Sequence, residues 1–82
     1  MEINNAEVIT TLLSVILSSM ALGFAQRKQY VSEYIHSDNE IKNIAFDMLR
    51  KGYLHMDNYT GLIQLSEPVE VILTDYNVIK KA

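Results

Sequence analysis

The chain has 82 residues, which fits a single domain near the lower size at which a hydrophobic core holds without disulfides or metals. It has no cysteine, which excludes disulfides and thiolate metal clusters and favours a cytoplasmic setting. A formal net charge of −3 argues against broad electrostatic attraction to nucleic acid or to an anionic membrane. The hydrophobic share of 49% is high for this length, so we expect a partner protein or a second copy to cover part of the apolar surface.

A long helix is predicted at the N-terminus. Asn4 and Glu7 have the spacing of a capping box, in which each side chain can bond a free backbone N–H at the start of a helix. Ile3, which precedes the cap, can contact Val8 after it. Gly23 is expected to end or bend this helix, because glycine inside a helix costs ~1 kcal/mol relative to alanine.

Three interpretations of the apolar segment VITTLLSVILSSMALGFA compete. A secretory signal would need lysine or arginine before the apolar stretch, where the only charged residues of this chain are the acids Glu2 and Glu7. A membrane span would be short and would contain several serine and threonine residues. A mostly buried helix explains the polar residues best, because they recur at helical spacing as a narrow seam. This polar seam consists of Glu7, Thr11, Ser14 and Ser18.

The apolar stripe of this helix is wide enough to pack on its own domain and on a neighbour at once. We therefore expect it to supply the contact with a second copy, as in a homodimer, or with a larger protein. The interface residues predicted on this basis are Ile9, Leu13, Ile16, Leu17 and Met20.

A short second helix is predicted over Arg27–His36, with Val31, Tyr34 and Ile35 facing inward and the basic residues at its start outside. Tyr30 and Tyr34 stand one turn apart and could form a stacking surface for single-stranded nucleic acid. We favour the alternative, in which both tyrosines line the rim of a helix interface with their hydroxyls in water.

A third helix begins at a Ser-x-x-Glu capping box formed by Ser37 and Glu40. Its core-facing stripe consists of Ile41, Ile44, Ala45, Met48 and Leu49. Gly52 suits the left-handed residue that ends a helix, and Tyr53 can then pack back on Met48, as in a Schellman motif. The short link between the second and third helices is typical of a helix-turn-helix.

A β-hairpin is predicted next, with strands at Tyr53–Asp57 and Leu62–Leu65 and a polar turn at 58–61. The last segment has two interpretations. Its β-branched residues and partial alternation would suit a strand. We favour a helix with Pro68 in its first turn, because apolar residues keep helical spacing as far as Ile79 and the final lysines, Lys80 and Lys81, would complement the helix dipole.

This order of elements and two motifs resemble the winged helix-turn-helix superfamily. MLRKGYL (Met48–Leu54) is similar to the leucine-x-x-x-glycine-leucine-isoleucine end of that superfamily's recognition helix, and IQLSE (Ile63–Glu67) is similar to the leucine-threonine-glutamate close of its wing. The expected fold class is therefore mostly α with a small β-hairpin. It is a winged helix-turn-helix with a long N-terminal helix and a C-terminal helix, formed by residues 1–82 as a single domain.

The resemblance implies a recognition helix at Ser37–Lys51 and a wing tip at Asp57–Gly61. In DNA-binding members, the start of this helix enters the major groove and basic side chains hold the phosphates. Here the acidic residues would repel the DNA backbone, so binding to protein is favoured over binding to DNA. The exposed residues expected on this recognition surface are Asp38, Asn39, Glu40, Lys42, Asn43, Asp47 and Asp57.

Binding to DNA would require a basic patch. The residues that could contribute phosphate contacts are Arg27, Lys28, Arg50 and Lys51, with Lys42, Lys80 and Lys81 as further candidates. The sequence does not show whether they share a face.

No motif indicates catalysis or a cofactor. His36 and His55 are interpreted as solvated or helix-terminal side chains, and His55 with Asp57 offers two metal ligands without a third. The sequence thus predicts a non-catalytic winged-helix interaction module that acts as an adapter or regulatory subunit through protein–protein contacts. The alternative is a dimeric winged-helix DNA-binding transcription regulator, and attachment to a membrane is disfavoured.

Overall fold

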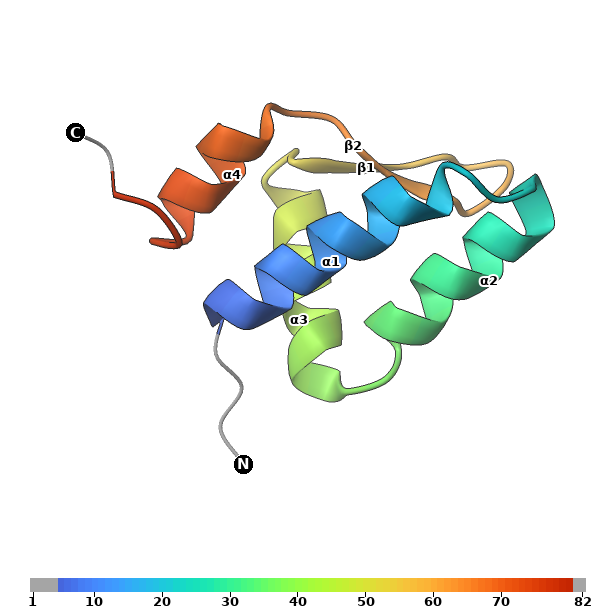
Figure 1. Ribbon diagram of the computed structural model, residues 1–82, viewed down its shortest axis with the longest axis horizontal. Coiled ribbons are helices and arrows are strands. Elements are labelled where there is room, and N and C mark those ends of the chain that lie inside the picture. The colour runs from blue at the N-terminus through green and yellow to red at the C-terminus, as the bar shows by residue number, and fades with distance from the viewer. Residues whose placement is uncertain (1–4, 81–82) are drawn as a thin grey trace.

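The computed structural model describes residues 5–80. The elements along the chain are α1 (Asn5–Ser19), α2 (Phe24–Ile35), α3 (Asn39–Arg50), β1 (Leu54–Met56), β2 (Ile63–Leu65) and α4 (Val69–Asp75) (Figure 1). The fold is mostly helical with a small antiparallel hairpin, which is the winged-helix-like arrangement expected from the sequence. Three residues, 36–38, join α2 to α3, so these two helices have the connection of a helix-turn-helix.

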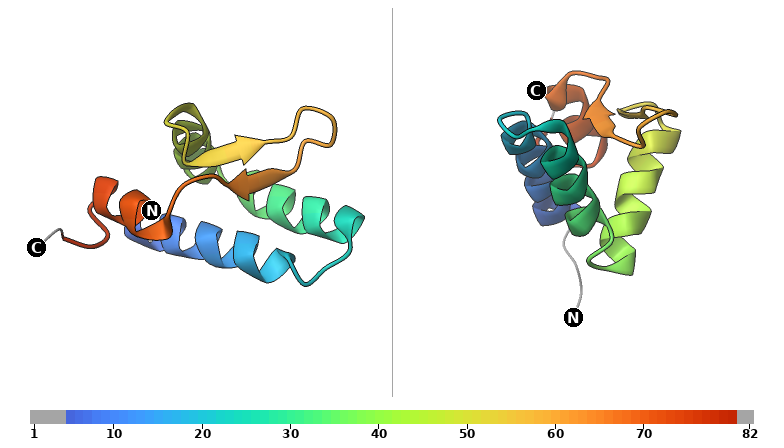
Figure 2. Two further views of the ribbon diagram at one scale, coloured as in Figure 1. Left: turned by 90° about the horizontal axis from the view of Figure 1, so that it is seen from above. Right: turned by 90° about the vertical axis from the view of Figure 1, so that its right-hand side faces the viewer.

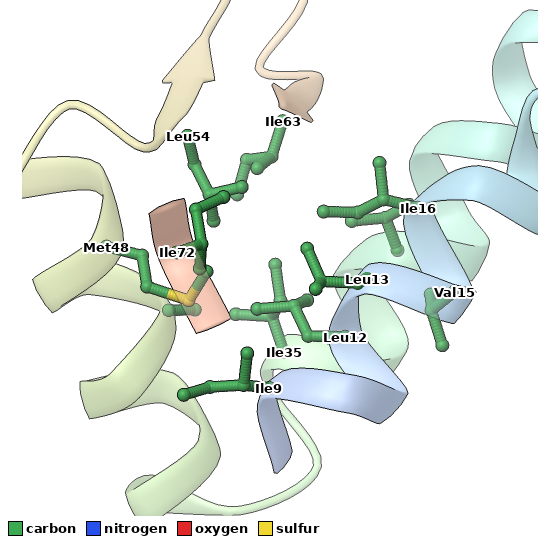
Figure 3. Close-up of a cluster of buried hydrophobic side chains, with 12 residues drawn as sticks. Ile9, Leu12, Leu13, Val15, Ile16, Ile35, Met48, Leu54, Ile63 and Ile72 are labelled. Carbon is green, nitrogen blue, oxygen red and sulfur yellow. The ribbon is translucent and has the colours of Figure 1, made fainter. Parts of the chain in front are cut away.

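The first helix lies at the centre of the molecule. α1 contacts α2, α3, α4 and β2, and Figure 3 shows its apolar side chains meeting those of the other elements in one cluster. Its buried residues are Val8, Ile9, Leu12, Leu13, Val15, Ile16 and Ser19. The predicted polar seam is confirmed, since all four of its residues are exposed. The wide apolar stripe of α1 is therefore used within its own domain.

The end of α1 differs from the prediction. The helix ends at Ser19 rather than at Gly23, and the chain tightens into a turn in which the N–H groups of residues 20–22 bond carbonyls three residues back. The buried Ser19 hydroxyl donates to the carbonyl of Ile16 at 2.6 Å, the group that a continuing helix would offer to the N–H of Met20. Gly23 instead precedes α2 in an extended conformation. The predicted cap at Asn4 and the contact of Ile3 lie outside the described residues.

The second helix begins at Phe24, three residues before the predicted start at Arg27. Its inward face is confirmed, because Val31 and Ile35 are buried and Tyr34 is half-buried. The hydroxyl of Tyr34 donates to the carbonyl of Val8 at 3.3 Å, which ties α2 to α1. Burial raises the pKa of this phenol. The expectation that this hydroxyl lies in water is therefore wrong.

The start of α3 is shifted by one residue from the prediction. Asp38 is the cap, and its carboxylate accepts the N–H of Glu40 at 2.8 Å. The Ser37 hydroxyl instead donates to the carbonyl of Tyr34 at 2.6 Å, at the end of α2. A carboxylate is the stronger acceptor at the positive end of a helix, so Asp38 caps α3 while the hydroxyl and the N–H of Ser37 both bond a carbonyl in the last turn of the preceding helix.

The end of α3 follows the prediction. Gly52 has φ of +85°, its N–H bonds Leu49 at 3.1 Å, and the N–H of Tyr53 bonds Met48 at 2.9 Å. These two bonds define a Schellman motif. The Ser66 hydroxyl also donates to the Gly52 carbonyl, which fastens the end of the hairpin to the end of α3.

The predicted hairpin is confirmed, with Leu54, His55 and Met56 paired to Leu65, Gln64 and Ile63. The C-terminal segment forms a helix, as favoured, although α4 ends at Asp75, short of the predicted helix that continued through Ile79 to the final lysines. Asn77 follows it with φ of +61°, and its N–H bonds the Thr74 carbonyl at 3.0 Å. Pro68 precedes the helix as its cap, and Lys80 lies beyond the last turn that it was expected to complement.

Replacing a core residue of α1 should destabilise the domain far more than replacing an exposed one. Leu12→Ala removes a fully buried side chain and should lower the free energy of unfolding by about 2–5 kcal/mol. Leu17→Ala, on the same helix but 52% exposed, should change it by less than about 0.5 kcal/mol. Urea denaturation of the two variants compares them directly, and equal losses would contradict the central role of α1.

Candidate functional site

The predicted oligomer interface is wrong for three of its five residues. Ile9, Leu13 and Ile16 are only 0%, 5% and 4% exposed, because they fill the core between α1 and the elements around it. They cannot contact a partner while the domain is folded. Leu17 and Met20 differ, with 52% and 66% of their surface exposed. The available apolar surface of α1 is thus confined to its C-terminal end.

Two exposed apolar residues that the interface prediction omitted extend this surface. Leu22 lies in the turn after α1, and Phe24 is the first residue of α2. With Leu17 and Met20 they form what we call the turn patch: Leu17, Met20, Leu22 and Phe24. Their positions on either side of Gly23, away from the periodic stripe of α1, are the signal that could have identified them. Large exposed apolar side chains that follow one another this closely along the chain are candidates for protein contact.

A groove separates the end of α1 from β2. It has a volume of about 190 Å³, and it is lined by Ile16, Leu17, Ser19, Met20, Arg27, Ile63, Gln64 and Leu65. Figure 2 shows β2 as the strand nearer to α1, with β1 on its far side. We call this the edge groove. It adjoins the turn patch, since Leu17 and Met20 belong to both.

Asp47, predicted to be on the recognition surface, is engaged by neighbouring side chains instead of facing solvent freely. The Tyr76 hydroxyl of α4's cap donates to this carboxylate at 2.6 Å, and Lys51 lies 3.2 Å from it, while Arg50 pairs with its other oxygen. The hydrogen bond from Tyr76 is the main cause that lowers the pKa of Asp47, and burial together with Asp47 raises the pKa of Tyr76. Asp47, Arg50 and Lys51 therefore form a cluster that joins α3 to the end of α4.

Two further acids of the predicted surface shape the backbone. Asp38 caps α3, and Asp57 accepts the N–H of Tyr59 at 2.8 Å inside the hairpin turn. This bond is the main cause that lowers the pKa of Asp57. Tyr59 itself is fully exposed at the wing tip.

The remaining residues of the predicted recognition surface lie on α3, as expected. Asn39, Glu40 and Asn43 are exposed, while Lys42 is half-buried with its ammonium 5.7 Å from the ring centre of Phe46. Phe46 is an exposed aromatic residue that the prediction omitted, and it falls outside the i, i+3, i+4 pattern of the core stripe. An apolar ring at the middle of this face suits a protein surface better than a row of phosphates.

The structure does not gather the predicted basic contacts into one patch. Arg27 lines the edge groove, whereas Lys28 lies beside Gly61 in the hairpin turn. Arg50 and Lys51 both pair with Asp47, and the Lys51 ammonium also lies 4.5 Å from the ring centre of Tyr76. Arg27 was expected outside but is half-buried.

The two histidines lie on different elements. His36 is exposed at the end of α2, and His55 is exposed on β1. Within residues 5–80, no three acidic or histidine side chains are grouped so that they could hold a metal ion. The absence of catalysis and of a cofactor stays a prediction. Tyr34 packs against the core, so it does not form an open stacking surface with Tyr30.

Among the described residues, no helix has both the length and the apolar character needed to cross a membrane. Comparisons with protein-family models, with curated proteins and with solved structures found no match. The likeness to winged helices therefore rests on the order and packing of the elements.

Removing the Tyr76 hydroxyl should loosen the contact between α3 and α4. Tyr76→Phe deletes the hydrogen bond to Asp47 while keeping the ring, and should lower the free energy of unfolding by about 1 kcal/mol, since the pair is partly exposed to solvent. Tyr59→Phe is the matched control, because that phenol is fully exposed and its loss should have no effect. Thermal unfolding followed by circular dichroism measures both.

The same pair predicts a pH dependence. Because the folded state lowers the pKa of Asp47 below its ordinary value of 3.8, the carboxylate stabilises the fold above that pH. This stabilisation should fade as the pH falls below 3.8 toward the lower pKa of the folded state. Between pH 5 and pH 3, measured as unfolding in urea, Tyr76→Phe should therefore lose less stability than the wild type. A parallel decline in both proteins would show that Asp47 does not contribute.

Proposed function

We propose that the chain is a non-catalytic protein-interaction module that acts as an adapter or regulatory subunit. The observation that carries this proposal is the turn patch, in which four large apolar side chains are exposed between residues 17 and 24. Exposing apolar area to water costs free energy in proportion to that area, and a partner that covers the patch removes this cost. The proposed cytoplasmic location rests on the absence of cysteine.

The distribution of apolar residues supports this assignment. The sequence has a high hydrophobic share, and most of the apolar residues of α1 are spent in the domain's own core. What remains exposed on α1 lies at one end and continues across the following turn. Interfaces place their large apolar residues together at the centre of the contact, with polar residues around them.

The alternative, a dimeric winged-helix DNA-binding regulator, has less support. Arg50 and Lys51 are engaged by Asp47, and Arg27 and Lys28 lie at two different places. The exposed residues at the start of α3 include Asp38 and Glu40, which would repel phosphates.

Photo-crosslinking tests the proposal. A benzophenone amino acid at position 20 or 24 should crosslink the chain to a protein partner in its native cells. The same amino acid at Ser14 is the control, because this position is exposed on the polar seam of α1. An adduct of twice the chain's mass would identify a second copy as the partner. No adduct from the patch, or equal adducts from position 14, would contradict the proposal.

Binding to DNA is measured separately by fluorescence anisotropy. A mixed-sequence duplex titrated with the protein should show no salt-dependent binding. Phosphate contacts would appear as a linear fall of the logarithm of the binding constant with the logarithm of the salt concentration. Such a salt dependence would reveal phosphate contacts and would favour the DNA-binding regulator.

A further inference from the structure

The outer edge of β2 carries unpaired backbone groups. The N–H of Asp57 bonds the carbonyl of Leu62 at 3.0 Å, which fixes the alternation of bonded and non-bonded pairs along the hairpin. By this alternation, Ile63 and Leu65 belong to non-bonded pairs, so their N–H and C=O groups point away from β1. None of the described residues bonds these groups. Both residues line the edge groove.

The opposite wall of the groove is mostly apolar. It is formed by Ile16, Leu17 and the buried Ser19 of α1 and by Met20 just after it, and β2 runs beside it (Figure 2). Leu17 and Met20 are exposed, so a side chain that enters the groove would cover them. A row of backbone donors and acceptors next to an apolar wall is the combination that binds an extended peptide.

Arg27 adds a cation that has no counter-ion among residues 5–80. Its Nε is buried and has no hydrogen-bond partner, and its guanidinium makes no ion pair with any residue in the described range 5–80. A buried donor without an acceptor is unfavourable and is rarely left so in a folded protein. The guanidinium is suited to a carboxylate, which it can bind through two parallel hydrogen bonds.

We propose that the edge groove binds an extended segment of the partner protein as an added β-strand, with an aspartate or glutamate of that segment paired to Arg27. The N–H and C=O groups of Ile63 and Leu65 bond the backbone of the segment. Its alternate side chains face the apolar wall at Leu17 and Met20, because successive residues of a strand point to opposite faces. This inference rests on the proposed function and names the class of partner segment that the module recognises.

An extended segment fits better than the other occupants. A helix satisfies its own backbone groups and would leave those of β2 unpaired. Duplex DNA would place phosphates here, and the groove is walled by apolar side chains with Arg27 as its single cation among the lining residues. A second copy that joined through its own β2 would bring its whole domain against α1, which flanks the open edge (Figure 2).

Peptide selection on the intact chain tests the inference. A phage library of random dodecapeptides is panned on the full protein, and the most enriched peptide is synthesised with a fluorescent label. The enriched sequences should alternate apolar residues and carry at least one aspartate or glutamate. When the peptide binds, hydrogen exchange at the N–H groups of Ile63 and Leu65 should slow by about tenfold or more, as expected for newly paired amides. The N–H of His55, already paired with β2, is the internal reference.

Two matched substitutions test the carboxylate. Arg27→Gln should raise the Kd of the peptide by about tenfold or more, since a charged hydrogen-bonding partner is lost. Lys28→Gln removes a neighbouring cation that lies by the hairpin turn instead of the groove, and should change the Kd by less than about twofold. Circular dichroism verifies that both variants fold.

A third protein, made by chemical synthesis with N-methyl-leucine at position 65, removes an edge donor and keeps the side chain. Because this N–H does not bond β1, the hairpin should persist while peptide binding is lost. Failure to enrich any peptide, or binding that leaves Ile63 and Leu65 exchanging freely, would overturn the strand-addition inference. If the peptide experiments fail but positions 20 and 24 still crosslink to a protein, the proposed function is supported and only the strand-addition inference is wrong. If those crosslinks are absent as well, the proposed function is also contradicted.

Discussion

The burial of α1 is the constraint on which the rest of the structure depends. Four other elements contact this helix, and it supplies five residues of the buried core cluster, Ile9, Leu12, Leu13, Val15 and Ile16. The hairpin alone has two strands of three residues, which are not stable in isolation. Ile9 and Leu12 are fully buried among residues from α2, α3 and α4, as Figure 3 shows. The apolar face of α1 therefore serves the fold first, and only its last turn remains for contact with another molecule.

The contact between α3 and α4 engages three charged side chains of α3 and its cap. Tyr76 reaches Asp47 across 29 positions of sequence, and this carboxylate then holds Arg50 and Lys51. The tyrosine ring also lies edge-on to Tyr53, with 6.4 Å between ring centres. Cations that could have contacted phosphates thus stabilise the packing of the C-terminal helix. An acidic residue of the predicted recognition surface is thus a structural group.

Features set by short stretches of sequence were predicted well. The end of α3 follows from Gly52 and its neighbours alone, and the hairpin follows from alternating apolar residues around a polar turn. The cap of α3 was misplaced by one residue because Ser37 and Asp38 are adjacent acceptors, and the Ser37 side chain is engaged by the carbonyl of Tyr34 at the end of α2. The periodicity that identified the core stripes also left Phe46 off the stripe.

Features that depend on distant contacts were not predicted. The role of Asp47 requires a partner in α4, and the half-burial of Arg27 requires the position of β2 beside α1. The interface residues within α1 were misassigned for a related reason. An apolar stripe that is too wide to be covered by one packing element indicates that several elements cover it. Here all of those elements belong to the same domain. Sequence periodicity measures how much of a helix is covered, without identifying what covers it.

The early end of α1 connects the two surface features that have no role in the core. The Ser19 hydroxyl donates to the carbonyl of Ile16, the backbone tightens into a turn, and only four residues, 20–23, separate α1 from α2. Leu22 and Phe24, on either side of Gly23, are exposed. The turn patch and the edge groove meet where the buried Ser19 ends the helix, because Leu17 and Met20 belong to both.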